Sequence, residues 1–234
     1  MLIAHARELE FTNQHLEQFA YIASHDLQEP LWMITSFLKQ LEKKYGGKLD
    51  EKGHQYIYFA TDGANRVRQI ILDLLEYSRV GKNLEAPENV DKDIIEDYLI
   101  LRKKIIEEKN VIIIFENLPT VRLSKPPFTQ AIHSLLDNSI KYGKESIPPK
   151  ILISASETVN SWQIQIKDNR IGIEPEYFEK IFVLFQRLHN RNEYEGTGIG
   201  LAIAKKNVES WNGKIWLESK VDEGSTFYFT IPKT

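Results

Sequence analysis

The sequence predicts a protein of two parts, an α-helical hairpin followed by a mixed α/β domain. Three observations lead to this fold class. Apolar residues recur at helical spacing through roughly the first 80 positions, a linker-like stretch follows, and five later segments have the composition of strands. The 234 residues are enough for one large or two small domains with a substantial core.

Composition narrows the class of protein. Hydrophobic residues make up 42% and charged residues 27%, and the formal net charge is −3, so no basic footprint for nucleic acid is present. The chain has no cysteine, which excludes disulfides and thiolate metal sites and suits a reducing cytoplasm. No apolar run approaches the roughly 20 residues needed to cross a bilayer, and the opening residues turn charged too soon for a signal peptide. We therefore expect a cytoplasmic chain with no nucleic-acid partner and no membrane contact of its own.

Residues 2–45 are predicted to form one long helix. Leu2, Leu9 and Leu16 are spaced by seven, as in a coiled-coil seam, so residues 1–17 are expected to be the end of a coiled-coil signal helix. Farther along, an apolar stripe continues at steps of three and four: Leu27, Leu31, Ile34, Leu38 and Leu41.

Gly46 and Gly47 are suited to ending this helix, and a second helical stripe follows them. It consists of Tyr56, Phe59, Gly63, Val67, Ile70, Leu74 and Tyr77. Two helices with a short connection form an antiparallel hairpin, which we place at residues 18–80. Such a hairpin cannot bury its own stripe, and a homodimer forming a four-helix bundle is the simplest solution.

The pattern changes after residues 78–90, which resemble a linker in composition; we place the linker itself at 81–90 and a second domain at 91–234. Helices are expected at 91–108, 126–143 and 198–211. Strands are expected at 111–116, 150–156, 162–168, 213–219 and 225–231. This order predicts a sheet with helices on one face.

His25 and Asp26 stand side by side on the first helix. His25 precedes Leu27 of the stripe by two residues, about 200° of rotation, so it should point away from the bundle core. A neutral imidazole is a nucleophile, and a neighbouring carboxylate can orient the ring or take its proton. Pro30 lacks an N–H, so we expect a bend one turn beyond the histidine that could act as a hinge. An exposed, merely solvated histidine is the simpler reading of the pair alone.

Glycines indicate a phosphate site elsewhere in the chain. Gly196, Gly198 and Gly200 precede or open the helix expected at 198–211, and bare N–H groups at a helix N-terminus attract phosphate. Such glycines alone are weak support, because glycines also terminate strands. Asp168 at a strand end and Gly172 in the following turn strengthen the reading.

Two residues of the helix upstream add to this constellation. Asn138 offers an oxygen of the kind that suits Mg²⁺. Lys141 lies three residues later on the same face, where it could reach a phosphate. Each residue taken singly also fits an ordinary solvated helix face. Together with the glycines, they favour a nucleotide site.

These residues closely resemble the transmitter region of sensor histidine kinases of two-component systems, in the branch joined to phytochrome- or PAS-type sensors. "SHDLQEPL" resembles the phosphoacceptor box, and residues 14–80 are similar to the dimerisation and phosphoacceptor hairpin. Residues 87–234 resemble the ATP-binding domain shared with gyrase, heat-shock and mismatch-repair ATPases, an α/β sandwich of the GHKL (Bergerat) type. The order of an H box, an N box, two glycine boxes and a phenylalanine box is highly specific.

The resemblance implies roles for individual residues. His25 would be the phosphoacceptor, Asp26 its acid/base or orienting partner, and Asn138 the Mg²⁺ ligand. Asp168 would receive the adenine amino group. Further residues implied at the ATP site are Lys141, Tyr142, Gly172, Ile173, Gly196, Thr197, Gly198, Gly200 and Leu201.

The same resemblance implies a mobile lid at residues 186–196, with Phe182 and Phe185 packed beneath it; plain core packing explains these two rings equally well. The implied reaction is phosphoryl transfer from Mg²⁺-bound ATP to a histidine nitrogen. Relay to an aspartate on a response-regulator receiver domain would follow. A homodimer and an upstream sensor domain, absent from this chain, are the other implied partners.

Five positions depart from the family pattern. Arg170 stands where the family has glycine, so a left-handed backbone costing about 1–2 kcal/mol is expected there. Its guanidinium could occupy the adenine site or pair with a phosphate. Ser134 replaces an asparagine, Ser139 a typical alanine and Trp32 an arginine that is common in this branch. Glu29 stands where phosphatase-competent relatives have Thr or Asn, so phosphatase activity is not expected.

Two alternatives to an active kinase follow from these observations. The first is a dimeric phosphotransfer or scaffold module with an impaired nucleotide site, for which Arg170 and Ser134 are the grounds. The second is an ATPase of the gyrase or heat-shock type without histidine phosphorylation, against which the hairpin with its His-Asp pair argues.

Overall fold

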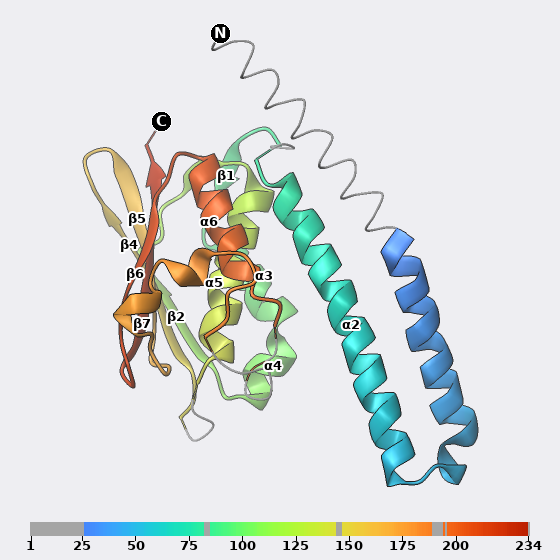
Figure 1. Ribbon diagram of the computed structural model, residues 1–234. Coiled ribbons are helices and arrows are strands. Elements are labelled where there is room, and N and C mark those ends of the chain that lie inside the picture. Colours follow the sequence, from blue (N-terminus) through green and yellow to red (C-terminus); the bar gives the residue numbers. More distant parts are fainter. Residues whose placement is uncertain (1–25, 82–84, 144–146, 189–193, 195, 234) are drawn as a thin grey trace. The chain divides into compact units, whose positions relative to one another are not determined.

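The computed structural model describes residues 26–81, 85–143, 147–188, 194 and 196–233. The chain divides into two compact units, residues 1–79 and residues 80–234. Figure 1 labels the elements of both units. The expected coiled coil at residues 1–17 and His25 lie outside the described residues.

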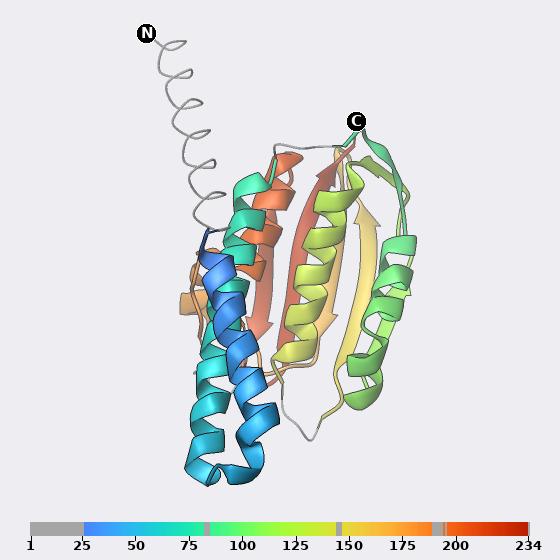
Figure 2. The same cartoon turned by 90° about the vertical axis from the view of Figure 1, so that its right-hand side faces the viewer.

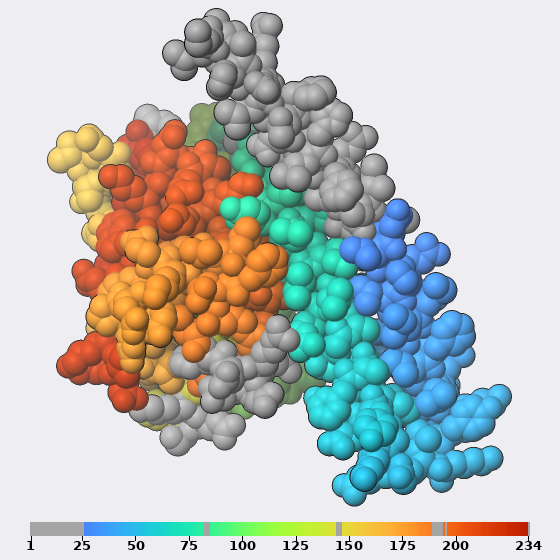
Figure 3. All heavy atoms as spheres, in the orientation of Figure 1, coloured from blue at the N-terminus to red at the C-terminus, as the bar shows by residue number. Residues whose placement is uncertain are grey.

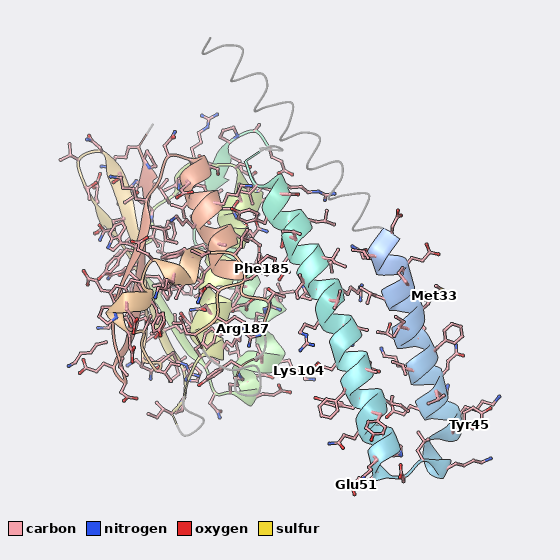
Figure 4. The ribbon with its side chains drawn as sticks, viewed as in Figure 1. Met33, Tyr45, Glu51, Lys104, Phe185 and Arg187 are labelled. Carbon is pink, nitrogen blue, oxygen red and sulfur yellow. The ribbon has the colours of Figure 1, made fainter. Side chains whose placement is uncertain are left out.

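The first unit is a helical hairpin, as predicted. Residues 26–45 are helical, η1 covers Gly46–Lys48, and α2 covers Glu51–Arg79. The Asp50 carboxylate accepts a hydrogen bond of 2.8 Å from the Gly53 N–H, which satisfies one of the free donors at the start of α2. Tyr45 and Glu51 mark the two sides of the turn in Figure 4.

Two different faces of α2 are apolar. The buried residues of α2 are Ile57, Ala64 and Ile71, spaced by seven. The stripe predicted from the sequence lies on a different face and stays largely exposed: Tyr56 is 68% and Phe59 is 59% accessible. The helix thus has one apolar face that is covered and one that is not. The apolar spacing in the sequence identifies the face that is not covered.

The second unit contains a five-stranded mixed sheet in the order β2-β4-β5-β7-β6. β2 pairs parallel with β4, and the other pairs are antiparallel. Inward side chains align across it, as in the row Ile153, Ile166 and Phe227. The strand bounds are Ile112–Glu116 (β2), Lys150–Glu157 (β4), Ser161–Asp168 (β5), Ile215–Lys220 (β6) and Gly224–Pro232 (β7).

Helices cover one face of this sheet, and Figure 2 shows them in front of the strands. They are α3 (Asp93–Leu101), α4 (Lys103–Glu108), α5 (Lys125–Lys141) and α6 (Gly200–Ser210). Tyr98 of α3, Leu135 of α5 and Phe229 of β7 are fully buried between the helices and the sheet. The predicted α/β sandwich is confirmed. Its core is fixed by alternating apolar residues in the strands and by helical stripes above them.

Local differences from the prediction have simple causes. A small sheet pairs β1 (Glu88–Val90) with β3 (Val121–Leu123), strands too short and polar to show an alternating pattern. The helix expected at 91–108 is two helices, separated at Arg102, whose ψ of 11° departs from helical values. Between β5 and α6 lie η2 (Pro175–Tyr177) and η3 (Lys180–Phe182), and this orange segment forms part of the outer surface in Figure 3. No helix in the described part of the chain is long and apolar enough to cross a membrane.

Candidate nucleotide-binding site

Asp168 is the buried anchor of the site, at the last residue of β5. Its Oδ1 accepts hydrogen bonds from the backbone N–H groups of Arg170 (3.1 Å) and Ser225 (3.0 Å). Its Oδ2 accepts one from the Ser139 hydroxyl at 3.2 Å. Burial raises the pKa of this carboxyl, and the hydrogen bonds to its ionised form oppose the rise. The carboxylate is therefore fixed in orientation, and Oδ2 retains capacity to accept a further donor from a ligand.

A pocket opens beside Asp168 and encloses about 530 Å³ of space, part of it open solvent. It brings together six of the predicted site residues: Asn138, Tyr142, Asp168, Gly172, Ile173 and Leu201. Apolar residues that the sequence did not single out complete the walls: Ile171, Ile181 and Leu188. An apolar slot with a single oriented carboxylate suits a flat ring that carries an amino group.

The turn after Asp168 needs its glycine. Gly172 has a φ of +73°, and a Cβ there would overlap the Lys220 carbonyl. The neighbouring Ile173 N–H donates to the Ser219 hydroxyl at 2.8 Å, and the Asp222 N–H donates to the Ile171 carbonyl at 2.7 Å. The end of β6 and the turn that follows it thus hold the loop through these two hydrogen bonds.

The predicted phosphate loop has the backbone that its glycines allow. Gly196 and Gly198 have φ angles of +139° and +76°, and Gly200 opens α6. A Cβ on Gly198 would come within 2.9 Å of the Gln186 carbonyl, so the chain passes too closely for a side chain. Thr197 lies between the two glycines, and the loop leads directly into the N-terminus of α6, where unpaired N–H groups favour anions.

Lys141 meets the glycine loop from the end of α5. A Cβ built on Gly196 would overlap the Lys141 ammonium, so the amine lies directly against this glycine. Its Nζ also donates to the Tyr142 hydroxyl at 2.9 Å and lies 4.4 Å from the centre of that ring. The Tyr194 ring packs on the Tyr142 ring, with centroids 5.0 Å apart. The structure thus places a cation where the sequence predicted a phosphate contact.

Arginine at position 170 does not strain the backbone. The described non-glycine residues with positive φ do not include Arg170, so the expected left-handed conformation is wrong. Arg170 is buried, with only 8% of the residue exposed. Its guanidinium donates to the main-chain carbonyls of Tyr142 and Ile147, at 3.0 and 3.2 Å. Arg170 lines one wall of the pocket, and its guanidinium donors point toward the protein backbone.

The two serine departures also acquire a structural reason. Ser139 is 1% exposed, and its hydroxyl is the third donor to Asp168, which an alanine would not provide. Ser134 lies against Gly200, where a Cβ would be 4.0 Å from its hydroxyl oxygen. A small residue at this position lets α5 and α6 approach closely.

The phenylalanines expected beneath a lid behave differently from each other. Phe182 is 8% exposed and belongs to the core. Phe185 is 52% exposed and has a φ of +63°, and its N–H donates to the Gly198 carbonyl at 3.0 Å. Nearby, the Arg187 guanidinium donates to the carbonyls of Tyr194 and Gly196; Figure 4 labels Phe185 and Arg187 in this segment. Sequence reasoning missed Arg187 because its partners are backbone atoms.

The hairpin carries the other half of the predicted chemistry. Asp26 is the first described residue of its helix and is exposed, whereas His25 lies outside the described residues. The described helix runs from Asp26 through Pro30, and the bend predicted there stays a prediction. Glu29 is exposed and Trp32 is 64% accessible.

A magnesium site built by the protein alone is not present in the described part of the chain, where no group of three His, Cys, Asp or Glu side chains converges. Asn138 lines the pocket with a single amide oxygen. Magnesium in nucleotide sites is commonly held by one or two protein ligands together with substrate phosphates. Asn138 therefore fits a metal that arrives with its nucleotide.

The fold and the pocket define a nucleotide-binding ATPase domain attached to a helical hairpin. Comparison with protein families agrees. Residues 124–234 match the family described as histidine kinase-, DNA gyrase B- and HSP90-like ATPase. Residues 15–83 match the His Kinase A (phospho-acceptor) domain. The chain therefore contains the phospho-acceptor domain and the ATPase domain of a histidine kinase.

Individual relatives show the same pairing of domains. The phytochrome-like protein Cph1 of Synechocystis sp. is 42% identical over 228 residues, which cover 97% of this chain and 30% of the relative. The chain thus spans about a third of the length of the curated relatives it matches. Among solved structures, full-length ShkA in complex with AMPPNP has a TM-score of 0.69 at 21% identity, covering 92% of this chain and 45% of that one. Histidine kinase ThkA in complex with the response regulator TrrA has a TM-score of 0.60 at 24% identity, covering 98% and 66%.

Proposed function

We propose that this chain phosphorylates its own His25 from ATP and passes the phosphoryl group to an aspartate of a response regulator. Two features together support the proposal. Asp168 presents an oriented carboxylate in the pocket, and Lys141, which donates to the hydroxyl of the pocket residue Tyr142, lies against the glycine loop before α6. A base with an amino group and a phosphate chain need such a division of polar groups.

Within this proposal the residues divide by the part of the nucleotide they contact. Asp168 accepts a hydrogen bond from the adenine amino group, and Gly172, Ile173 and Leu201 lie along the base. Lys141 and Tyr142 stand between base and phosphates. The phosphates are held by the loop residues Gly196, Thr197, Gly198 and Gly200. Asn138 supplies one oxygen to Mg²⁺, which would neutralise charge on the phosphates.

The transfer step needs a neutral histidine. A ring nitrogen of His25 attacks the γ-phosphorus, the new N–P bond forms, and the bond from phosphorus to the β,γ-bridging oxygen breaks to release ADP. Asp26 orients the ring or takes the proton from its other nitrogen. The phosphoryl group then moves from nitrogen to a carboxylate oxygen on the regulator, and His25 is restored.

The hairpin is proposed to act as a homodimer. Its uncovered apolar side chains, such as Phe37 (67% accessible) and Phe59 (59%), suit burial against a second copy. The ThkA complex makes a response-regulator receiver domain the proposed partner. A sensor region joined to residues 1–17, of the phytochrome-like kind in the relatives, is the proposed source of input. We propose a cytoplasmic location, because the proposed reaction uses ATP.

Incubation of the purified chain with Mg²⁺ and γ-labelled ATP tests the proposal. We expect label that is lost in acid, stable in alkali and located in the peptide that contains His25. A parallel binding measurement separates the alternatives. ATP bound with no label would favour the phosphotransfer module, and ATP hydrolysed with no phosphoprotein would favour the plain ATPase.

A further inference from the structure

The Arg170 side chain joins two segments that are distant in sequence. Its Nε donates to the Tyr142 carbonyl at 3.0 Å, one terminal nitrogen to Ile147 at 3.2 Å and the other to Ile140 at 3.4 Å. Ile140 lies in the last turn of α5, where carbonyls lack helical partners and a cation is favoured. The three-way contact matches the planar fork of a guanidinium, which a lysine cannot reproduce.

Gly143 provides the space for this guanidinium. A Cβ on Gly143 would overlap the central guanidinium carbon and two of its nitrogens. The backbone of Gly143 has no positive φ, so glycine is required here for room and not for conformation. The large side chain of Arg170 therefore occupies the space that a side chain at Gly143 would take.

Both segments joined by Arg170 form walls of the nucleotide pocket. The backbone N–H of Arg170 holds Asp168, and its guanidinium holds the carbonyl of Tyr142, a second lining residue. We propose that Arg170, seated on Gly143, is a positioning residue that sets nucleotide affinity by fixing the end of α5 against the Asp168 loop. This inference rests on the proposed ATP site and assigns to Arg170 a supporting role there, in place of an obstructing one.

The test compares variants of the full chain by calorimetric binding of ATP and of adenosine at a temperature where each variant is folded. Arg170→Met keeps most of the bulk and removes every side-chain donor. We expect both ligands to bind at least about tenfold more weakly, because the charge-assisted hydrogen bonds that shape the base end are lost. Arg170→Lys should recover only part of the affinity. Arg122→Met, an exposed arginine on β3, is the matched control and should stay within about twofold of the parent chain.

Gly143→Ala gives an independent route to the same result. The added methyl group displaces the guanidinium while Arg170 remains, so affinity should fall as it does in Arg170→Met. In an Arg170→Gly background, however, the alanine should add less than about a twofold loss, because the group it clashes with is gone. A purely structural role would lower the melting temperature of these variants without this coupling in ligand affinity.

The outcomes separate the inference from the function beneath it. A parent chain that binds no ATP removes the proposed function and this inference together. A parent chain that binds ATP, with Arg170→Met within about twofold of it, overturns the positioning role alone. Tighter binding by Arg170→Gly than by the parent chain would also overturn it, because the guanidinium would then be an obstruction. Should Arg170→Met fail to fold, the Gly143→Ala pair decides.

Discussion

The two units of the chain treat their apolar side chains in opposite ways. The second unit encloses a core of its own, in which Tyr98, Phe227 and Phe229 are fully inaccessible. The hairpin leaves Trp32, Phe37, Tyr56 and others more than 60% accessible. Both units form regular helices or strands. Only the second unit completes a core from its own residues.

This difference supports the proposed homodimer of the hairpin. A sheet covered by helices can enclose a core within one chain, whereas two helices offer each other only one face apiece. Buried Ile57 and Ala64 occupy the covered face of α2, and exposed Phe59 lies about 140–200° around the helix from them. We therefore propose that the nucleotide site lies in a unit that is complete alone, and that the phosphoacceptor lies in a unit completed by assembly with a second copy.

The largest expected effect comes from placing charge on the hairpin stripe. Phe59→Glu would bury two carboxylates per dimer, because the interface is symmetric, and should weaken dimerisation by roughly 4 kcal/mol or more. Analytical ultracentrifugation should show monomers where the parent chain is dimeric. ATP affinity should be unchanged, since the pocket lies in the other unit.

Val159→Glu is the control for that substitution. Val159 is 91% accessible in the turn between β4 and β5 and belongs to no apolar stripe, so the same change of charge there should leave the dimer intact. A parent chain that sediments as a monomer would contradict the assignment of the stripe.

The next effect concerns the second unit alone. Asp168→Asn keeps the volume but turns one acceptor into a donor that faces the donors of Arg170 and Ser225 or the adenine amino group, and ATP affinity should fall by roughly 2–3 kcal/mol. In the parent chain affinity should also weaken as pH falls, because burial raises the pKa of Asp168 and only the ionised carboxylate accepts fully. Titration calorimetry across pH would check both, and a dimer that dissociates in Asp168→Asn would contradict the separation of the units.

Sequence patterns predicted most of this fold and six of the residues that line the pocket, for physical reasons that differ. β5 and β7 alternate clearly, and Asp168, Gly172 and Asn138 belong to motifs that reflect ligand chemistry. Ser225 was missed because it acts through a backbone N–H, which leaves no mark on residue type.

Arg170 shows where residue letters mislead. The family glycine suggested a strained backbone, but φ is set by the whole turn, and the side chain finds carbonyls 23 to 30 residues away. Such contacts depend on tertiary structure. The two apolar faces of α2 are a similar case, since periodicity identifies a face but not what covers it.

A smaller effect is expected within the core that supports the site. Tyr98 is fully buried and donates to the Asp137 carboxylate at 2.7 Å, which Arg102 also binds at 2.6 Å. Tyr98→Phe removes one hydrogen bond but leaves the ion pair, so unfolding free energy of the second unit should fall by about 1 kcal/mol, or about 2–4 °C in melting temperature. Differential scanning calorimetry measures it, with the hairpin variants as unaffected references.

The smallest effect is a pH dependence in the same region. Burial lowers the pKa of His133 below its ordinary value of 6.5, and its Nε2 has no hydrogen-bond partner within the described part of the chain. The folded unit therefore favours neutral His133, and its stability is present above pH 6.5 and declines as pH falls toward the lowered pKa, by less than about 1 kcal/mol. His133→Gln should reduce the dependence of the unfolding free energy on pH, measured by chemical unfolding at pH 5 to 8. An unchanged dependence on pH would show that other groups cause it.

The separation of roles is tested most directly by comparing His25→Gln with Asp168→Asn in one phosphorylation and binding experiment. The account predicts that His25→Gln binds ATP with the affinity of the parent chain and acquires no acid-labile phosphate, while Asp168→Asn binds ATP more weakly by roughly 2–3 kcal/mol and acquires correspondingly less label. Acid-labile label on His25→Gln, or undiminished label on Asp168→Asn, would contradict it.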